Sequence, residues 1–572
     1  MRVIATAGHV DHGKSTLVRL LTGMEPDRWA EERRRGLTID LGFAWTALGG
    51  TRIAFVDVPG HHRFVPNMLA GIGPVPAVMF VVAADEGWKP QSSEHLAALD
   101  ALRVRHGVLV VTRTDLADPA PAVAEATERL SRTSLGTLPH VAVSARTGQG
   151  LDDLRAALVT LAARMPVPER EADVRLWLDR SFTVAGAGTV VTGTLAAGTI
   201  SRGDELELAS TGQQLTVRGL HTLGNKADVV TGVARVAVNL RGADRTELVR
   251  GDALLSPGRF LASTVLDVRC PVELPGQLVL HVGSAAVGAR VRPLGTETAR
   301  LTLARALPVR VGDRVLLRDP GGKAVLGGAD VLALDPPRLR RGGASARSSE
   351  LRTEDPLRIF LRDRVFARFR QLRAAGLVPP DAAEWHADPA RWRTLALALP
   401  AEHESWQGAH PLEPGVPADV LRQRLGLPDP ALLPPLVAAA GLELTDGRVR
   451  RPGAAALPAR VETALAALAA DLSESPFAAP DSERLHRLGL GGKEIAAAVR
   501  AGRLVRIADG VVLLPDAPGR AATLLSALPA PFTLSQARQA LGTSRRVAVP
   551  LLELLDRRGV TERLPDATRR LR

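Results

Sequence analysis

The segment Gly8-His-Val-Asp-His-Gly-Lys-Ser15 constrains the fold of this chain more than any other feature. It fits the pattern GxxxxGK[ST], in which backbone amides surround phosphate groups, the lysine reaches the β- and γ-oxygens, and the hydroxyl holds magnesium. The apolar residues 3–7 before it predict a strand, and residues 16–21 after it predict the start of a helix. This is the context that the motif requires, so the segment predicts a nucleoside triphosphate site on an α/β domain.

Further segments supply the other groups that such a site needs. Asp57 ends an apolar run at the tip of a predicted strand, where its carboxylate can orient magnesium. Gly60 supplies a flexible amide for the γ-phosphate. Thr38 lies in a polar loop and is suited to completing the magnesium shell when the γ-phosphate is present. The expected magnesium ligands are therefore Ser15, Thr38 and Asp57.

Two later segments bear on the base. Thr112-Arg-Thr-Asp115 and Ser144-Ala-Arg146 each follow a predicted strand, and they resemble the guanine-reading pair of P-loop GTPases. In that pair the aspartate accepts hydrogen bonds from N1 and N2 of guanine. Adenine lacks those donors, so Asp115 is expected to select GTP and GDP. The expected nucleotide-binding residues are Gly8, His9, Val10, Asp11, His12, Gly13, Lys14, Ser15, Thr16, Asp57, Gly60, Thr112, Arg113, Asp115, Ser144, Ala145 and Arg146.

The guanine motif departs from the usual Asn-Lys-x-Asp of the family at its first two positions. Here they are Thr112 and Arg113. Arg113 can lay an aliphatic stem and a flat cation along the base, but arginine and lysine are not interchangeable. The departure leaves the nucleotide affinity open and does not affect the expected guanine specificity.

The wider strings GHVDHGKST, RGLTID and DVPGHHRF resemble translational GTPases of the EF-Tu type rather than signalling GTPases. The resemblance implies that His61 orients the attacking water, with Val10 and Leu37 as an apolar gate. The alternative makes His61 a surface residue of a turn. The neighbouring histidines are interpreted as structural or solvent-facing: His9, His12 and His62.

Length and composition bound the other possibilities. A chain of 572 residues is expected to hold several domains. The single cysteine, Cys270, excludes a disulfide framework and a cysteine-based zinc site, and it fits a reducing compartment. The N-terminus runs directly into the P-loop strand, which leaves no room for a signal peptide, and no apolar run approaches a membrane span. A soluble cytoplasmic protein with no membrane association is expected.

The positive charge is concentrated in the C-terminal part. Residues 337–572 carry 35 basic and 26 acidic side chains, so they hold most of the net charge of +12. A basic region of this kind favours a polyanionic partner, most simply a nucleic acid.

The pattern of apolar residues divides the chain. Residues 1–168 alternate strands with helical stretches, which predicts an α/β GTP-binding domain with a mainly parallel sheet. Shorter alternating strands with glycine turns predict two antiparallel β-barrels at residues 172–258 and 259–336. GTPase domain, barrel, barrel is the order found in EF-Tu. Residues 336–349 are rich in Pro, Gly, Ser and Arg, which predicts a linker.

A repeated unit comes after the barrels. Each copy has a turn that opens a helix, an apolar helix that ends at glycine, and a short strand pair, which predicts a winged helix-turn-helix. The expected α+β copies span residues 409–453, 455–518 and 520–572, with a divergent copy at 350–408. The alternative is a plain helical repeat for protein contacts.

An EF-Tu-like body with tandem winged helices resembles the bacterial selenocysteine-specific elongation factors, the SelB family, over essentially the whole chain. The resemblance implies a monomeric, ribosome-stimulated GTPase that delivers selenocysteinyl-tRNA to the ribosome at recoded UGA codons. It also implies that the C-terminal winged helices bind an mRNA hairpin, the SECIS element. A general EF-Tu-like factor or a sulfate-activation GTPase would explain only the first 335 residues. A GTP-regulated DNA-binding protein would explain the winged helices but not the barrels.

The resemblance also implies an aminoacyl pocket between the GTPase domain and the first barrel, at Asp179, Arg180, Phe182 and Arg235. A selenol is more acidic than a thiol, so selenocysteine carries a negative side chain at neutral pH. Arg235 or Arg180 would favour it over neutral serine, and Asp179 would accept from the α-amino group. The alternative is an ion pair on the barrel surface.

The terminal winged helix is expected to bind the RNA hairpin through Thr543, Ser544, Arg545 and Arg546. Thr543 or Ser544 is expected to cap a helix whose first turn presents the two arginines. Hydroxyls, cations and the positive helix end would then face phosphates together. Winged helices bind both RNA and DNA, so this segment alone leaves the nucleic acid open.

Overall fold

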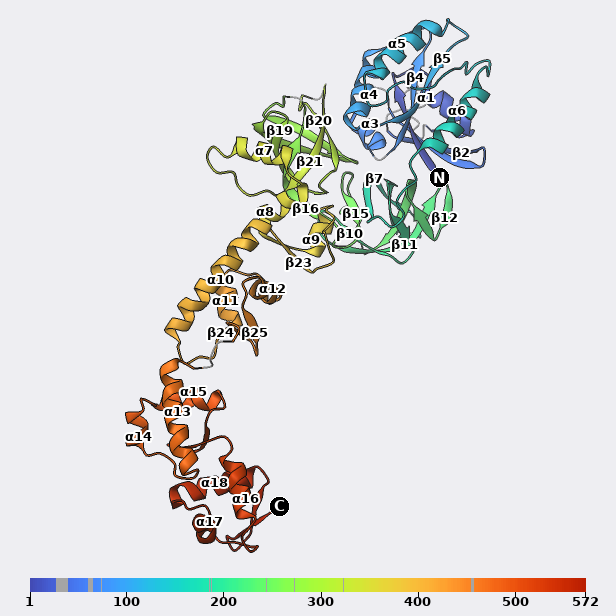
Figure 1. Ribbon diagram of the computed structural model, residues 1–572. Helices are drawn as coiled ribbons and strands as arrows, with labels where there is room; N and C mark the ends of the chain where they lie inside the picture. The colour runs from blue at the N-terminus through green and yellow to red at the C-terminus, as the bar shows by residue number, and fades with distance from the viewer. Residues whose placement is uncertain are drawn as a thin grey trace. The chain divides into compact units, whose positions relative to one another are not determined.

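The computed structural model describes residues 1–26, 40–59, 65–73, 75–184, 186, 188–242, 244–271, 273–321, 324–453 and 457–572. The chain forms two compact units, Met1–Asp388 and Pro389–Arg572, which we call the N-terminal and C-terminal units (Figure 1). None of the helices in the described ranges is both long enough and apolar enough to span a bilayer.

The first domain of the N-terminal unit is a six-stranded sheet with helices on both faces (Figure 1). The strand order is β2-β3-β1-β4-β5-β6, and all neighbours are parallel except β2 and β3. The strands are β1 (Arg2–Gly8), β2 (Gly42–Leu48), β3 (Thr51–Asp57), β4 (Ala77–Ala83), β5 (His106–Thr112) and β6 (His140–Ala142). The helices are α1 (Lys14–Thr22), α3 (Val65–Ile72), α4 (Pro90–Ala101), α5 (Ala120–Ser131) and α6 (Leu151–Arg164).

The two faces of this sheet have separate cores because successive strand residues point to opposite sides. Val78 and Phe80 of β4 pack in the core that includes α3, α4 and α5. Met79 of the same strand packs in the core that includes α1 and α6. The parallel strands are buried on both faces, which is why their sequences are continuous apolar runs rather than alternating ones.

Two antiparallel barrels come next along the chain. In the first, β10 pairs with both β11 and β15 and so closes the ring β10-β15-β7-β8-β14-β11. The strands of this sheet are β7 (Arg175–Val184), β8 (Gly188–Leu195), β10 (Glu205–Leu208), β11 (Gln214–Thr222), β12 (Asn225–Ala227), β14 (Ala234–Arg241) and β15 (Ala253–Leu255). In the same domain β9 (Thr199–Ser201) and β13 (Val229–Thr231) pair with each other as a separate two-stranded sheet.

The second barrel is closed in the order β16-β19-β18-β17-β20-β21. Its strands are β16 (Leu261–Arg269), β17 (Gln277–Val282), β18 (Ala285–Gly295), β19 (Thr298–Val309), β20 (Arg314–Arg318) and β21 (Val325–Leu334). The predicted fold class, an α/β GTPase domain followed by two barrels, is confirmed.

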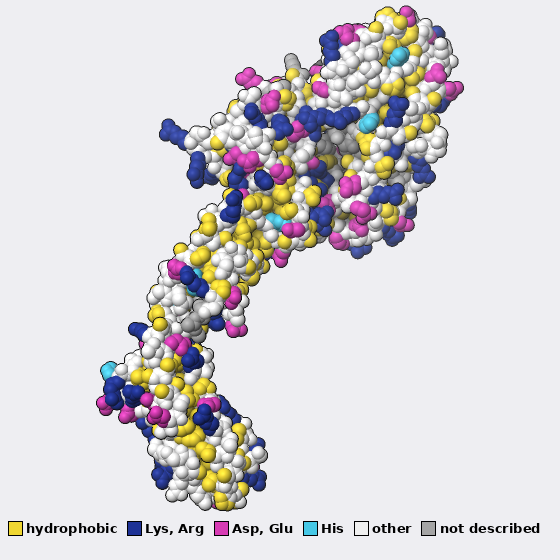
Figure 2. Space-filling view, viewed as in Figure 1, with side chains coloured by type: hydrophobic (Ala, Val, Ile, Leu, Met, Phe, Trp, Pro, Cys, Tyr) yellow, Lys and Arg dark blue, Asp and Glu magenta, His cyan; other side chains and the backbone are white. Residues whose placement is uncertain are grey.

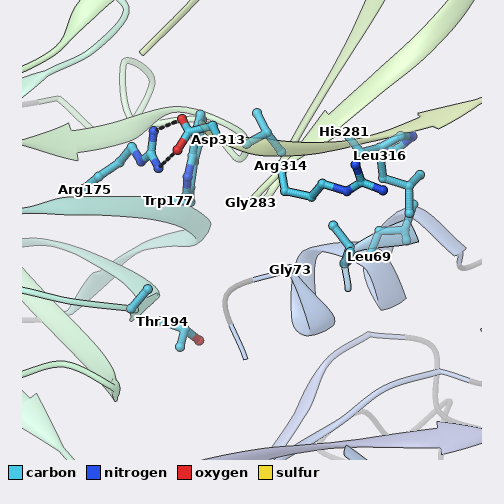
Figure 3. Close-up of a pocket in the computed structure, with 13 residues that line it drawn as sticks. Leu69, Gly73, Arg175, Trp177, Thr194, His281, Gly283, Asp313, Arg314 and Leu316 are labelled. Atoms are coloured by element: carbon cyan, nitrogen blue, oxygen red, sulfur yellow. Dashed lines mark hydrogen bonds and ion pairs between the residues drawn. The ribbon is translucent and has the colours of Figure 1, made fainter. Parts of the chain in front are cut away.

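Ion pairs join the three domains around a cavity of about 130 Å³ (Figure 3). Arg175 of the first barrel faces Asp313 of the second and donates to both of its oxygens, at 2.5 and 2.9 Å. Asp330 of β21 accepts from Arg103 of the GTPase domain at 3.0 and 2.9 Å and from Arg314 of its own barrel at 3.0 Å. Bidentate arginine pairs define orientation as well as distance, so these contacts fix how the three domains are oriented relative to one another.

The segment after the second barrel corrects the predicted linker at 336–349. The helix α7 (Ala344–Thr353) begins inside it, and Arg347 on that helix is only 5% exposed. Arg347 donates to the fully buried Asp267 of β16 at 2.8 Å and to both oxygens of Asp363 at 2.9 and 2.7 Å. Polar composition predicted a loop here, but the buried ion pairs attach the segment to the barrel.

The N-terminal unit ends with α8 (Pro356–Arg364), β22 (Phe366–Arg368), α9 (Phe369–Ala374) and β23 (Trp385–Ala387). Phe360 and Leu372 of this segment pack in the same core as the second barrel. The unit closes at Asp388, inside the range 350–408 expected for a divergent winged helix. The helix α10 (Pro389–Ala409) instead packs on the following winged helix, so the expected boundary at 408 differs from the structure.

The C-terminal unit contains three helical bodies that each end in a β-hairpin (Figure 1). The first consists of α10, β24 (Val416–Pro417), α11 (Ala418–Arg424), η2 (Pro430–Leu432), α12 (Leu433–Ala439), β25 (Glu443–Thr445) and β26 (Arg448–Arg450). The second consists of α13 (Ala459–Glu474), α14 (Ser482–Arg487), α15 (Gly492–Arg500), β27 (Val505–Ala508) and β28 (Val511–Leu513). The third consists of α16 (Ala517–Leu525), α17 (Leu534–Ala540), α18 (Arg545–Arg557), β29 (Thr561–Arg563) and β30 (Arg569–Leu571).

The last two of these winged helices share one hydrophobic core. The buried residues of this single core lie between Leu457 and Leu555 in the sequence. They include Phe477 of one body and Phe532 of the other. Because both bodies bury side chains against each other, we describe them together as the terminal pair.

The buried network around Arg347 generates a stability prediction. Arg347→Ala is expected to lower the free energy of unfolding by about 3–5 kcal/mol, because it leaves Asp267 and Asp363 without their cation. Arg352→Ala removes an exposed arginine from the same helix and is expected to change stability by less than about 0.5 kcal/mol. Urea unfolding of both variants measures the difference, and equal stabilities would show that the network holds nothing in place.

Candidate functional site

The P-loop joins β1 to α1, and its backbone depends on glycine. Gly8 has a φ of 127°, and a Cβ there would lie 2.1 Å from the carbonyl oxygen of Val81. Gly13 is also left-handed, at 85°. Lys14 is 5% exposed, and its Nζ donates to the carbonyl oxygens of Gly8 at 3.1 Å and His9 at 2.6 Å. The ammonium therefore lies across the loop where the motif predicts phosphate.

The structure brings together the two expected magnesium ligands that it describes. The Ser15 hydroxyl donates to one carboxylate oxygen of Asp57 at 2.6 Å, and the Thr6 hydroxyl donates to the other at 2.7 Å. Asp57 is fully buried at the end of β3, and burial raises its pKa against the hydrogen bonds from Ser15 and Thr6. A hydroxyl and a carboxylate are the hard oxygen ligands that magnesium prefers, so the pair fits the ion.

The other residues expected at the γ-phosphate lie outside the described residues. They are Thr38, Gly60 and His61, and the expected gate residue Leu37 and the neighbouring His62 also lie outside the described residues.

The two guanine segments meet at Asp115. The buried Ser144 hydroxyl donates to one Asp115 oxygen at 2.7 Å, and Arg146 donates to the other from Nε at 2.8 Å. The hydrogen bond from Ser144, followed by that from Arg146, lowers the pKa of Asp115. An ionised carboxylate accepts hydrogen bonds only, which matches the N1 and N2 donors of guanine. Ala145 lies half-buried between its two neighbours.

Thr112 and Arg113, the two positions that differ from the usual guanine motif, both form hydrogen bonds to the P-loop. The Thr112 hydroxyl donates to the carbonyl oxygen of His12 at 2.8 Å. Arg113 donates from Nη2 to the carbonyl oxygen of Asp11 at 2.5 Å. Both side chains thus reach the P-loop, although the sequence suggested only that Arg113 lies along the base.

Two buried histidines lie at the P-loop, one within it and one on the neighbouring helix α4. His12 is fully buried beside the carbonyl oxygen of Val81, and burial lowers its pKa to about 4. His95 on α4 accepts the Gly8 N–H at Nδ1, 3.1 Å away, and burial lowers its pKa to about 3. Both rings are neutral at physiological pH. Sequence reasoning missed His95, because a single histidine in a helix carries no pattern.

The expected aminoacyl pocket is a cavity of about 230 Å³ between β2 and β3 of the GTPase domain and β7, β8, β11 and β14 of the first barrel. Arg235 of β14 forms a bidentate ion pair with Asp179 of β7, and it also donates to the Thr192 hydroxyl at 3.0 Å. Its guanidinium lies 3.8 Å from the ring centroid of Phe43. The expected residues therefore do converge, and the ion pair considered as the alternative is part of the same pocket.

Arg180 of β7 also lines this cavity. It donates to the carbonyl oxygen of Leu41 at 2.6 Å and pairs with Asp40 at 2.9 Å. Phe182 also lines the cavity and is 38% exposed. Sequence reasoning missed His221, which lines the cavity from β11 without any recognisable motif.

The four expected RNA-binding residues separate into two pairs. Ser544 is the N-cap of α18 but makes no capping hydrogen bond through its side chain, and Arg545 is exposed. Thr543 donates to the carbonyl oxygen of Phe477 at 2.5 Å, and Arg546 donates to that of Gly510 at 2.9 Å. Ser544 therefore occupies the expected N-cap position without a hydroxyl cap, while Thr543 and Arg546 are bound to carbonyl oxygens of the preceding winged helix.

The charge on the terminal pair is spread rather than gathered. On the face shown in Figure 2, basic side chains lie scattered over the end of the chain, with acidic ones close to several of them. Arg569 is buried against Asp556 at 2.9 Å, and Arg570 pairs with Glu562. A nucleic-acid contact there would therefore depend on particular side chains rather than on a broad basic field.

Comparisons with family models agree with this division of the chain. Residues 1–164 match the Elongation factor Tu GTP binding domain, and residues 188–255 match Elongation factor Tu domain 2. Residues 265–338 match the beta-barrel domain of the selenocysteine-specific elongation factor, and residues 523–570 match the winged helix of elongation factor SelB.

Individual relatives point the same way. A selenocysteine-specific elongation factor from Desulfomicrobium baculatum is 39% identical over 337 residues, which cover 55% of this chain and 53% of that protein, so the chain spans about half the length of this curated relative. Elongation factor Tu 2 of Streptomyces avermitilis is 30% identical over 370 residues, which cover 56% of this chain and 94% of that protein. The crystal structure of a bacterial selenocysteine-specific elongation factor, EF-Sec, has a TM-score of 0.79 at 26% identity and covers 100% of both chains.

Proposed function

Because the chain belongs to the selenocysteine-specific elongation factors among the EF-Tu-like translational GTPases, we propose that it delivers selenocysteinyl-tRNA to the ribosome at recoded UGA codons in the cytoplasm. The observation that supports this most is the cavity that the GTPase domain shares with the first barrel, because β3, which lines it, ends at Asp57, an expected magnesium ligand. A nucleotide-dependent movement of β2 and β3 would therefore change a pocket for the aminoacyl group.

The nucleotide residues would act mainly by position and charge. Lys14 would leave the carbonyl oxygens of its own loop for the β- and γ-phosphates, since the ammonium needs acceptors in either state. Ser15 and Asp57 would hold magnesium, which neutralises phosphate charge when bound. Asp115, held by Ser144 and Arg146, would read guanine. Thr38 would complete the metal shell, and His61 would orient the hydrolytic water.

Selection of the amino acid would rest on charge in the 230 Å³ cavity. Arg235 is only 13% exposed, so it interacts with a selenolate more strongly than it would in water. A bound α-amino group would compete for Asp179 and so release part of the Arg235 guanidinium for the negative side chain. Serine on the same tRNA offers no charge and would gain nothing from this exchange.

The mRNA hairpin would be bound by the terminal pair. Arg545 is exposed on the first turn of α18 beside the Ser544 N-cap, where backbone amides and the helix dipole favour phosphate. RNA recognition usually targets unstacked loop bases, and a planar arginine can stack on them or form forked hydrogen bonds. Thr543 and Arg546 would contribute by holding α18 against the preceding body.

Nucleotide binding and turnover test the first part of the proposal. The protein is expected to prefer GTP to ATP by roughly 100-fold or more, because adenine offers no N1 and N2 donors to the Asp115 carboxylate. Lys14→Ala is expected to abolish binding, whereas His61→Ala is expected to keep the GTP affinity and lose ribosome-stimulated hydrolysis. Equal affinities for ATP and GTP would remove the guanine assignment, and an unchanged turnover of the His61 variant would make that residue a surface residue.

Aminoacyl selection is tested at Arg235. Arg235→Ala is expected to reduce the preference for selenocysteinyl-tRNA over the seryl form by about tenfold or more in the GTP state, the effect of losing one hydrogen bond to a charged group. Arg235→Lys keeps the charge and should retain part of the preference. Arg241→Ala, at the exposed end of the same strand, serves as the control. A wild-type ratio in the Arg235→Ala protein would place discrimination in the tRNA body.

Hairpin binding is tested at α18, with the full-length protein at two salt concentrations. Arg545→Ala is expected to weaken binding by roughly 1–3 kcal/mol if the arginine contacts a base, or to reduce the salt slope by about one if it contacts phosphate. Arg520→Ala is the matched control, since Arg520 is an exposed arginine on α16 of the same body and is paired with Asp516 at 2.6 Å. Full affinity in the Arg545 variant would show that another face of the terminal pair reads the RNA.

A further inference from the structure

Two adjacent acids come directly after β4, the strand that lies between β1 and β5 in the sheet. Asp85 and Glu86 are 28% and 30% exposed and belong to neither the phosphate loop nor the guanine segments. Strands β1, β4 and β5 are parallel, so the segments after their carboxyl ends lie next to one another. The acids are thus placed between the P-loop and the residues Thr112 and Arg113.

Both acids bind the Arg113 guanidinium. Its Nη1 donates to Glu86 at 2.7 Å and to Asp85 at 3.0 Å, while its Nη2 donates to the carbonyl oxygen of Asp11. Arg113 has a φ of 55°, a left-handed conformation that is unfavourable for a non-glycine residue. That conformation aims the side chain back across the strand ends, and the two carboxylates offset its cost.

The contacts at the P-loop are on consecutive peptide groups. Arg113 binds the carbonyl oxygen of Asp11, and the Thr112 hydroxyl binds that of His12. In a planar trans peptide the C=O and the next N–H point in opposite directions. Holding these two oxygens toward β5 therefore turns the N–H groups of His12 and Gly13 the other way, into the loop where phosphate is expected.

We propose that Asp85 and Glu86 are positioning residues for nucleotide binding: they hold Arg113 on the Asp11 carbonyl and thereby keep the P-loop amides aimed at phosphate. The inference rests on the proposed nucleotide site. In this proposal Arg113 orients the P-loop, and Asp85 and Glu86 hold the Arg113 guanidinium in place.

The chemistry of the pair supports a fixed arrangement. An arginine that binds one carboxylate at the surface gains little, but a guanidinium shared between two carboxylates and a carbonyl oxygen forms a directional network. Glu86 also lies 3.6 Å from Lys89 and 3.9 Å from the buried His12 ring. Partial burial acts to raise the pKa of Glu86, but the hydrogen bond from Arg113 and the charges around the carboxylate outweigh burial and lower it. Groups from the P-loop, from the N-cap of α4 and from the residue after β5 therefore meet at one ionised carboxylate.

The test measures release of fluorescent GDP and GTP from the full-length protein. The isosteric double variant Asp85→Asn/Glu86→Gln is expected to release both nucleotides about 10-fold faster, which corresponds to about 1.4 kcal/mol. Its preference for guanine over adenine should be unchanged, because Asp115 is untouched. Glu128→Gln is the matched control, since it removes a carboxylate from a 2.6 Å surface ion pair in the same domain.

A double-mutant cycle separates positioning from a general loss of stability. Arg113→Gln should speed release in the wild-type background but add little to the double variant, because all three changes break the same contact. Release rates equal to those of the control, or fully additive effects, would overturn the proposal. Failure of the wild-type protein to bind guanine nucleotides would overturn both this inference and the proposed function, so the two failures are distinguishable.

Discussion

The carboxyl edge of a parallel sheet is the constraint on which the rest of the molecule depends. Parallel strands bring their ends to one side, so segments separated by up to a hundred residues become neighbours there. The Ser15–Asp57 contact joins the first turn of α1 to the end of β3, and the Asp115–Ser144 contact joins the segments after β5 and β6. The cavity beside the first barrel is lined in part by β2 and β3. A movement of these two strands would therefore change the cavity.

Arginine–carboxylate pairs recur wherever domains of the N-terminal unit meet. Arg175–Asp313 joins the barrels, Arg103–Asp330 joins the GTPase domain to the second barrel, and Arg180–Asp40 joins it to the first. Such pairs give orientation at little net gain in free energy, since desolvation offsets much of the attraction.

Residues placed by strand ends and glycine turns were the most predictable from the sequence, and residues placed by packing between domains were the least. Asp115 and Ser144 were predictable because each comes after an apolar strand run. Asp85 and Glu86 were not, because acids in a surface loop have no pattern until β4 is placed between its neighbours. The use of Thr543 to hold the preceding winged helix was likewise invisible, since its partner is a backbone carbonyl 66 residues away.

The common core of the terminal pair has a mechanical consequence. Under the proposed function, an mRNA hairpin bound at α18 would be pulled by the translating ribosome, so the contact would have to bear tension. Because Phe477 and Phe532 lie in one core, and Thr543 and Arg546 link α18 to the preceding body, strain at a bound hairpin would pass to that body. The two bodies would unfold together rather than one after the other. Joint unfolding would raise the force needed to break the attachment and narrow the range of force over which it breaks.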